Sequence, residues 1–305
     1  MHNRRLRSYI VVFLAPAVVI YSLFLIYPLI GSLGLSFFDD APDGGRVFVG
    51  LTNIRRLLTD ERWAPGFWNA VGNNVLFFVV HFVVQNPIGL LLATLLTAGR
   101  VRGRGAYRTV LFMPTMLSVV IVGFVWQLIL SPLWGVAEGF LTAVGRGELF
   151  QPWLGLQDTA LVTLSLISVW QFYGIPMMLF YAALIGIPRE LTESAYVDGA
   201  GSWNVFWRIK FPLILPVLGV VTVLTFVGNF NAFDLIYTTQ GVLAGPDFST
   251  DILGTYFFRT FFGQQLQLGN PTMGATVATM MFIIILLGVL AYMFAWRRRV
   301  QTYEL

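Results

Sequence analysis

The side chains able to do chemistry in this chain are few, and their spacing excludes most enzyme classes. Lys210 is the single lysine, and no glycine-rich loop precedes it, so a phosphate-binding P-loop is ruled out. His2 and His81 are the only histidines, which excludes metal motifs built on paired histidines. Cysteine is absent, and no serine lies in a nucleophile elbow. We therefore expect no enzyme activity, no metal and no cofactor in this chain.

Neutral and acidic polar residues inside apolar runs are the remaining candidates for contact with a solute. Amide and carboxylate groups bind sugar hydroxyls, and aromatic rings suit the apolar faces of a pyranose. The candidate substrate-path residues are His81, Gln127, Gln171, Tyr173, Asn229, Asn231 and Asp234. Counting from the expected inner helix ends at 1.5 Å per residue places His81, Gln127, Gln171 and Asn231 in one layer, roughly 24–29 Å from the inner side.

The same residues have a structural interpretation. Gln and Asn inside membrane bundles commonly join helices, for about 0.6 kcal/mol each, and Tyr commonly lies at the membrane interface. On the expected fifth helix, Asn231, Asp234 and Thr238 are spaced i, i+3 and i+7, which predicts one polar stripe. Both interpretations stay open from the residues alone.

The elements that must position these residues are transmembrane helices. Hydrophobic residues make up 57% of the chain and charged residues 11%, against about 25% charged residues in a soluble domain. The mean hydropathy is +0.75. Charges leave six uncharged windows, each long enough to cross about 30 Å of hydrocarbon: 8–38, 63–99, 109–137, 159–188, 211–233 and 260–296. We expect an all-α membrane protein in which residues 1–305 form a single transmembrane domain, with helices at approximately 9–31, 71–97, 109–131, 160–186, 213–238 and 273–296.

The distribution of cations predicts the orientation. With the N-terminus inside, the outer segments hold only six of the 19 Lys and Arg residues: Arg46, Arg55, Arg56, Arg62, Arg146 and Arg259. The inner segments hold the rest, including the basic turn at 99–105 and the C-terminal tail. Both termini are therefore expected to be cytoplasmic. The net charge of +4 reflects this orientation and gives no indication of nucleic-acid binding.

Residues 187–212, IPRELTESAYVDGAGSWNVFWRIKFP, form a charged segment between the fourth and fifth expected helices. Pro188 suits the first position of a helix, and Gly199 suits its left-handed end. Ser202 is a candidate cap for a second short helix, which we expect to end before Pro212. Four expected helices precede the segment and the N-terminus is expected to be inside, so we expect the segment to face the cytoplasm.

The second of these helices is expected to carry an aromatic face, because Trp203, Phe206 and Trp207 are spaced i, i+3 and i+4. Helices this short do not persist alone in water. The segment therefore needs a surface, which is either the lipid head groups or another protein.

The residue order favours another protein, because it resembles the EAA loop of permease subunits in binding-protein-dependent ABC importers. That pattern is Glu-Ala-Ala, three residues, Gly, nine residues, Ile, one residue, Leu-Pro. This chain holds the same spacing with Glu193-Ser194-Ala195, Gly199, Ile209 and Phe211-Pro212, and it departs at Ser194 and Phe211. The flanking residues Ile187-Pro188, Asp198-Gly199-Ala200 and Pro216 are similar to the carbohydrate branch of the family.

Two further stretches resemble sugar permeases. FVGLTNIRRLL followed by FWNAVGNN resembles the lead-in to the second helix, where we expect structural roles for Gly50, Asn53 and Trp68. FNAFDLIY resembles a segment of helix five, which favours solute contact for Asn231 and Asp234. The following TTQGVLAGP departs from the usual Thr-Gly-Gly-Gly-Pro ending.

The resemblance implies a six-helix permease subunit of a sugar importer in the bacterial inner membrane. It implies four kinds of partner: a second six-helix permease, a cytoplasmic ATPase dimer that holds ATP and Mg²⁺, an extracytoplasmic sugar-binding protein, and the sugar. The residues that would contact the ATPase or support that contact are Glu193, Ser194, Ala195, Asp198, Gly199, Ala200, Trp203, Phe206, Ile209 and Pro212.

The main alternative is a secondary transporter or channel that works alone on a small neutral solute. It is disfavoured because such transporters usually carry buried carboxylates, and Asp234 is the only acidic residue in or beside a helix core. A membrane-integral enzyme is a more distant alternative. Within the importer class, glycerol phosphate is disfavoured because the six windows contain no Lys or Arg to pair with a phosphate.

Overall fold

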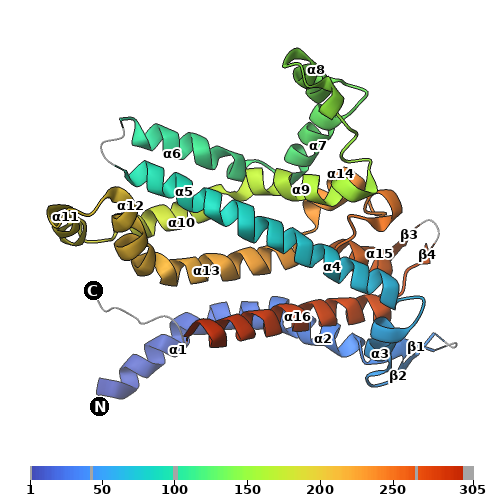
Figure 1. Ribbon diagram of the computed structural model, residues 1–305. Coiled ribbons are helices and arrows are strands. Elements are labelled where there is room, and N and C mark those ends of the chain that lie inside the picture. Colours follow the sequence, from blue (N-terminus) through green and yellow to red (C-terminus); the bar gives the residue numbers. More distant parts are fainter. Residues whose placement is uncertain (1, 42–43, 99–101, 265–266, 298–305) are drawn as a thin grey trace. The chain divides into compact units, whose positions relative to one another are not determined.

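The computed structural model describes residues 2–41, 44–98, 102–264 and 267–297, and nearly all of them are helical (Figure 1). They form two compact units, Met1–Phe67 with Tyr256–Ile283, and Trp68–Thr255 with Ile284–Leu305. The predicted all-helical class is confirmed, with short antiparallel hairpins added. The predictions for residues 99–101 and for the tail after Arg297 lie outside the described residues.

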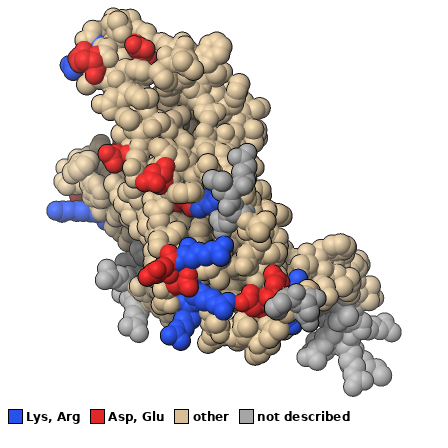
Figure 2. All heavy atoms as spheres, turned by 90° about the vertical axis from the view of Figure 1, so that its right-hand side faces the viewer, with Lys and Arg blue, Asp and Glu red and all other residues tan. Residues whose placement is uncertain are grey.

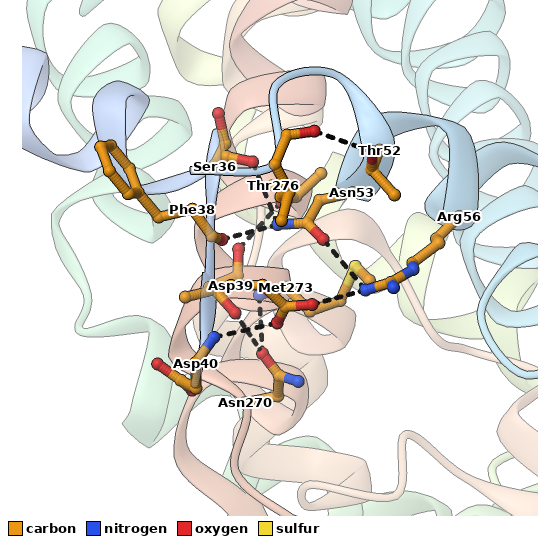
Figure 3. A network of polar contacts seen from close by, with 12 residues as sticks. Ser36, Phe38, Asp39, Asp40, Thr52, Asn53, Arg56, Asn270, Met273 and Thr276 are labelled. Carbon is orange, nitrogen blue, oxygen red and sulfur yellow. Dashed lines mark hydrogen bonds and ion pairs between the residues drawn. The ribbon is translucent and has the colours of Figure 1, made fainter. Parts of the chain in front are cut away.

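The first unit begins with helices and a hairpin, as follows: α1 (His2–Tyr21), the π-turn η1 (Ser22–Ile26), α2 (Tyr27–Leu35), β1 (Phe38–Asp40), β2 (Arg46–Phe48) and α3 (Thr52–Thr59). Side chains of α3 hold the hairpin (Figure 3). Arg56 Nη1 lies 2.6 Å from Asp39 Oδ2, and Asn53 Nδ2 donates to the Phe38 carbonyl at 2.7 Å. The structural role expected for Asn53 is therefore confirmed.

A second hairpin, β3 (Gly263–Gln264) with β4 (Gln267–Leu268), leads into α16 (Pro271–Arg297). Asn270 caps this helix, because its Oδ1 accepts from the Met273 backbone N–H at 2.8 Å. Pro271 occupies the first helical position, where its missing N–H costs nothing. The last predicted helix, 273–296, therefore starts two residues earlier than expected.

The second unit holds most of the helices, and α4, α15 and α16 contain residues of both units. The elements are α4 (Ala64–Val80), η2 (His81–Gln85), α5 (Asn86–Thr97), α6 (Arg104–Phe112), η3 (Met113–Met116), α7 (Val119–Leu130), α8 (Val136–Ala143), η4 (Gly147–Leu149), α9 (Gln157–Phe172), α10 (Gly174–Ile185), α11 (Arg189–Val197), α12 (Ser202–Val205), η5 (Phe206–Lys210), α13 (Phe211–Phe230), α14 (Asp234–Gln240), η6 (Pro246–Phe248) and α15 (Leu253–Phe262).

Within the described ranges, four helical segments are long and apolar enough to cross a membrane: Val12–Leu35, Ala64–Thr97, Ser202–Gln240 and Pro271–Ala295. Two bent pairs pass the same test, α6 to η3 with α7, bent by 91°, and α9 with α10, bent by 43°. Counting each pair as one span gives the six spans expected from the sequence. Figure 2 shows one face on which Lys, Arg, Asp and Glu side chains gather within a largely uncharged surface.

The third helix predicted at 109–131 is present as a bent pair rather than as one continuous helix. Its first half ends in the 3₁₀ turn η3, which contains Pro114, and the chain resumes as α7 in another direction (Figure 1). The predicted fifth helix, 213–238, lies within the candidate span Ser202–Gln240 but is interrupted. Helix α13 ends at Phe230, and α14 restarts at Asp234 after Phe233 adopts a non-helical φ of −153°. Asn231, Asp234 and Thr238 therefore form no stripe on one continuous helix.

In the part of the chain that the structure describes, three π-turns widen the long helices, and a proline follows each by two residues: Pro28, Pro87 and Pro212. Proline has no N–H, and its ring clashes with the carbonyl four residues earlier. In each π-turn the residue before the proline bonds one position further back than in an α-helix, as Asn86 N–H does to His81 O. Pro16 and Pro216 lie inside helices without a π-turn, so a proline does not by itself produce a π-turn.

The close packing of α5 on α10 forms one core of the second unit. Gly89 permits the approach, because a Cβ built there would lie 2.9 Å from the Met177 backbone nitrogen. Ala93, one turn later on the same face, is fully buried. Small residues at this spacing let membrane helices approach closely.

Gly89→Ala tests this contact. We expect a loss of about 1–3 kcal/mol, because the added methyl must displace backbone rather than a mobile side chain. Gly72→Ala is the matched control, since Gly72 is also helical and a Cβ there meets no atom within 4 Å. Thermal unfolding of the detergent-solubilised protein, followed by tryptophan fluorescence, should separate the two variants. Equal melting temperatures would contradict the packing argument.

Candidate functional site

The segment 187–212 folds as a helical hairpin at the end of the second unit where α5 ends and α6 begins (Figure 1). Helix α11 ends in a Schellman motif. Gly199 has a φ of +83°, the Ala200 N–H donates to Ala195 O at 2.9 Å, and the Gly199 N–H donates to Tyr196 O at 3.1 Å. The predicted left-handed stop is confirmed. Pro188 is the residue before the helix rather than its first member.

The second helix differs from the prediction, because it does not end before Pro212. Helix α12 continues through η5 directly into α13, and Pro212 lies within the first turn of α13. Ser202 is the first helical residue, Gly201 is the N-cap, and no side-chain cap bond forms. The π-turn accommodates the proline that was expected to stop the helix. The segment is therefore joined to α13 without a break.

The aromatic face is present and extends by one residue. Trp203 and Trp207 have ring centroids 5.6 Å apart, and Phe206 and Trp207 are 5.1 Å apart. Phe211 adds a further ring 4.9 Å from Trp207. Trp203 is 73% exposed, and Glu193 on α11 is also exposed. The hairpin thus exposes a carboxylate and a large aromatic side chain.

A cavity of about 440 Å³ lies in the second unit, between η2, α9, α10, α13 and the start of α14. Its apolar lining includes Phe77, Phe172, Val221 and Leu224. Its polar lining consists of His81, Gln85, Ser168, Thr225, Asn229, Asn231 and Asp234. None of the described residues that line it is Lys or Arg. Asn231 and Asp234 are exposed, whereas the other five polar residues of the lining are buried.

The structure brings four of the predicted substrate-path residues to this cavity and leaves three outside. His81, Asn229, Asn231 and Asp234 line it. Asn231 and Asp234 flank the break between α13 and α14. Gln127 lies beyond the 91° bend and outside the lining. Gln171 and Tyr173 lie at the bend between α9 and α10, outside the lining.

His81 is held by two hydrogen bonds. Its Nδ1 lies 2.8 Å from Phe77 O, and because a carbonyl only accepts, Nδ1 carries the proton. Its Nε2 then accepts from the Ser168 hydroxyl at 2.9 Å. Both ring nitrogens of this neutral imidazole are occupied, so His81 shapes the wall and has no free group for a solute.

The two glutamines outside the cavity bind backbone at helix breaks. Gln127 Nε2 donates to Thr239 O. Gln171 Nε2 donates to Leu117 O at 3.0 Å, just after η3, and the Thr115 hydroxyl donates to Gln171 O at 2.9 Å. Here the structural interpretation of these amides holds, because they satisfy backbone groups that a bend leaves without a helical partner.

Asn74 joins the end of α13 to the start of α15. Its Nδ2 donates to Asn229 O at 2.9 Å, and its Oδ1 accepts from the Leu253 N–H at 2.8 Å. Asn229 also donates through Nδ2 to Thr225 O at 2.6 Å. The end of α13 is thereby fixed beside the break that carries Asn231 and Asp234.

Sequence reasoning missed Gln85, Ser168, Thr225 and Asn74. Ser, Thr and Asn are common enough in membrane helices to give no clear signal. Gln85 did have a sequence signal, because Pro87 lies inside an apolar run and predicts a distorted helical turn just before it. Gln85 is 6% exposed, and its Oε1 is buried without a hydrogen-bond partner among the described residues. Such an unpaired group costs about 1–3 kcal/mol.

Comparison with known proteins identifies relatives over most of the chain. Residues 85–300 match the family model described as "Binding-protein-dependent transport system inner membrane component". The probable ABC transporter permease protein YurN of Bacillus subtilis is 32% identical over 276 residues, covering 90% of this chain and 91% of that protein. The lactose transport system permease protein LacF of Rhizobium radiobacter is 33% identical over 255 residues, covering 82% of each chain.

A solved structure has the same fold. One chain of a bacterial ABC transporter involved in the import of the acidic polysaccharide alginate matches with a TM-score of 0.80 and 24% identity. The match covers 98% of this chain and 99% of that chain.

Gly199→Ala tests the end of α11. A Cβ at Gly199 meets no atom within 4 Å, so the only cost is the left-handed backbone, about 1 kcal/mol for a non-glycine residue. We expect amide hydrogen exchange in α11 to rise about fivefold. Gly201→Ala is the control, because Gly201 has an ordinary φ of −71° and equal space. Unchanged exchange in the Gly199 variant would contradict the assigned motif.

Ser168→Ala tests the bond to His81. The substitution leaves a buried imidazole nitrogen unpaired, and we expect a loss of about 1–3 kcal/mol in thermal unfolding. Ser165→Ala is the matched control on the same helix. Ser165 is equally buried, but its hydroxyl only adds a second bond to Leu161 O, at 2.7 Å. A larger loss in the control would show that the His81 bond is not the stabilising one.

Proposed function

We propose a function for this chain from one premise, which is that it belongs to the family of inner membrane components of binding-protein-dependent transport systems. It is a multi-pass permease of the inner membrane, and its family transports solutes rather than catalysing a reaction. The finer proposal is that it is the permease subunit of an ATP-driven importer for a neutral sugar. The proposed substrate is a di- or oligosaccharide. The observation that carries it is the match to permeases over more than four-fifths of the chain.

A neutral sugar is supported by the chemistry of the cavity. An anionic solute taken out of water needs a cation or several strong donors, and no described residue in the lining is Lys or Arg. Buried polar side chains alternate there with aromatic and aliphatic ones, which suits a ring with hydroxyl edges and apolar faces. His81 and Asn229 would shape this path, and Asn231 and Asp234 would meet the solute at its exposed rim.

The partners proposed are those of a complete importer. A second permease would complete the translocation path, an extracytoplasmic binding protein would deliver the sugar, and a cytoplasmic ATPase dimer would bind ATP and Mg²⁺. The exposed hairpin of α11 and α12 would be the ATPase contact. Glu193 would accept a charge-assisted hydrogen bond, and Trp203 and Phe206 would pack in the ATPase cleft. Ser194, Ala195 and Gly199 are small residues and would let the ATPase surface come close to the hairpin backbone.

Movement of this hairpin has a direct route to the cavity. Helix α12 continues through η5 into α13, and Val221, Leu224, Thr225 and Asn229 of α13 line the cavity. A displacement at the hairpin would therefore reach the cavity wall along a continuous helix. For ATP to drive import, the ATPase must bind one arrangement better than the other.

The rival is a transporter that works alone. The complete assembly, reconstituted in liposomes with binding protein outside and ATP inside, should take up a sugar from a panel of lactose, maltose, trehalose and raffinose. This permease alone should take up none. Uptake by the isolated chain, driven by an ion gradient without any ATPase, would replace the importer proposal with the rival.

Glu193→Lys tests the coupling hairpin. We expect uptake and sugar-stimulated ATPase activity to fall at least about tenfold, because a charge-assisted bond is lost and repulsion replaces it. Membrane insertion, followed by subunit amount in the membrane fraction, should be unchanged because Glu193 is exposed. Glu190→Lys makes the same charge change one turn earlier and should have a smaller effect. Normal uptake in the Glu193 variant would refute the coupling role.

A further inference from the structure

We propose that a groove between α7 and α9 binds one phospholipid of the outer leaflet, with an amine head group at Asp158 and an acyl chain along α9. The groove is separate from the solute cavity, and the proposal requires only that this chain spans a membrane. It is carried by the order of polar and apolar residues along α9, by the single charge in the lining, and by the side of α9 on which the groove lies.

The groove has a volume of about 530 Å³ and lies within the second unit. Three tryptophans line it: Trp126 of α7, Trp170 of α9, and Trp153 of the segment before α9. Trp126 and Trp170 meet edge to face, with ring centroids 5.6 Å apart. Trp153 is joined to the first turn of α9, because its backbone carbonyl accepts from the Thr159 hydroxyl at 2.8 Å. The groove thus has a large aromatic side chain at each end of its α9 wall.

The α9 wall changes from polar to apolar along the helix. Four of its lining residues are spaced by four and lie on one side of the helix on successive turns: Asp158, Val162, Leu166 and Trp170. Thr159 and Thr163 add hydroxyl groups to the first half only. With the orientation expected from the cations, α9 begins on the outer side. The groove is therefore polar near the outer surface and apolar toward the membrane interior.

The length of this wall matches one leaflet. At 1.5 Å per residue the path from Asp158 to Trp170 is about 18 Å long, and half of a hydrocarbon core is about 15 Å thick. A polar end followed by an apolar path of this length fits an amphiphile. A sugar fits it less well, because its hydroxyls would lie against Val162, Leu166 and Leu130 without polar partners.

The groove lies on the side of α9 that faces away from the solute cavity. Ser168 and Phe172 line the cavity, and each follows a groove residue, Leu166 or Trp170, by two positions. Two residues turn an α-helix by about 200°, so α9 separates the two spaces. A second permease that completes the translocation path belongs on the cavity side. The groove side is therefore left to lipid.

The charge in the groove selects the head group. Of the described residues in this lining, Asp158 alone is charged, and it is exposed. A carboxylate attracts an ammonium group and repels a head group of net negative charge, and an aromatic ring such as that of Trp153 adds a cation–π attraction. Indole N–H groups are donors and can serve the phosphate. Phosphatidylethanolamine is therefore favoured over phosphatidylglycerol.

A purely interfacial role for the same residues makes a different prediction. Tryptophans commonly lie at membrane interfaces, and an acidic residue in the first turn of a helix, as Asp158 is, interacts favourably with the helix dipole. Neither effect distinguishes one head group from another. Selective retention of an amine lipid that depends on Asp158 therefore separates a built site from an interfacial belt.

The experiment uses the assembly of this permease with its partner subunits, in nanodiscs of equimolar phosphatidylethanolamine and phosphatidylglycerol. After release into detergent, native mass spectrometry counts the retained lipids. We expect wild type to retain phosphatidylethanolamine in preference to phosphatidylglycerol by about two- to fivefold, and Asp158→Asn to abolish the preference. Glu138→Gln is the matched control, because Glu138 is an exposed carboxylate in the first turn of α8 and is absent from the lining. It should keep the preference.

A second variant tests the acyl path. Val162→Trp places a bulky side chain in the groove and should lower the retention of both lipids at least about fivefold. Val120→Trp is its control, because Val120 lies on α7, is 55% exposed and is absent from the lining. It should leave retention unchanged.

Equal retention of the two lipids by wild type, or an unchanged preference in Asp158→Asn, would overturn the proposal. Undiminished retention in Val162→Trp would overturn it as well, because the lipid would then lie elsewhere. Loss of the second permease from the Val162→Trp assembly would assign the groove to that subunit, and displacement of the lipid by lactose or maltose would assign it to a sugar. These readouts do not depend on transport, so a failure of sugar uptake would contradict the proposed function and leave the lipid site intact.

Discussion

The need to satisfy backbone hydrogen bonds in apolar surroundings is the constraint on which the rest of this structure depends. A straight helix satisfies its own groups, but each bend or break leaves some without a helical partner. In this chain side chains supply the missing partners. Gln171 binds Leu117 O beside the bend after α6, Gln127 binds Thr239 O at the end of α14, and Asn74 binds Asn229 O where α13 ends. The bends exist because specific polar side chains stabilise them.

The same constraint explains how the chain accommodates proline within long helices. Where a proline removes a donor, the π-turn moves the preceding hydrogen bond by one residue and keeps the helix continuous. At η5 this continuity joins the exposed hairpin of α11 and α12 to α13. At about 1.5 Å per residue, the helical path from Ser202 to Phe230 is long enough to cross the hydrocarbon layer. A break at Pro212 would have separated the hairpin from the cavity wall.

Sequence reasoning succeeded where one local rule decides the outcome and failed where two compete. The charge-free windows identified the spans, and Gly199 identified the end of α11 because only a left-handed position fits there. The helix stop at Pro212 was wrong, and the helix expected at 109–131 is bent. In both cases the local effect of proline is clear, but whether the chain bends, breaks or widens depends on partners from other helices. Gln171, which binds Leu117 O and accepts from Thr115 at the bend, is such a partner, and its distance in the sequence hides it.

A buried amide can therefore be assigned a role from its backbone surroundings. Beside a break it has an unpaired carbonyl or N–H within reach, and it becomes part of the fold, as Gln127, Gln171 and Asn74 do. Inside a π-turn the helix remains hydrogen-bonded through its shifted ladder, so a polar side chain there has less backbone to satisfy. His81 found Ser168 and Phe77, whereas Gln85 Oε1 found no partner among the described residues. Gln171 Oε1 and Asn86 Nδ2 are likewise buried without a partner among the described residues, so an unpaired amide atom does not by itself mark a solute site in this bundle.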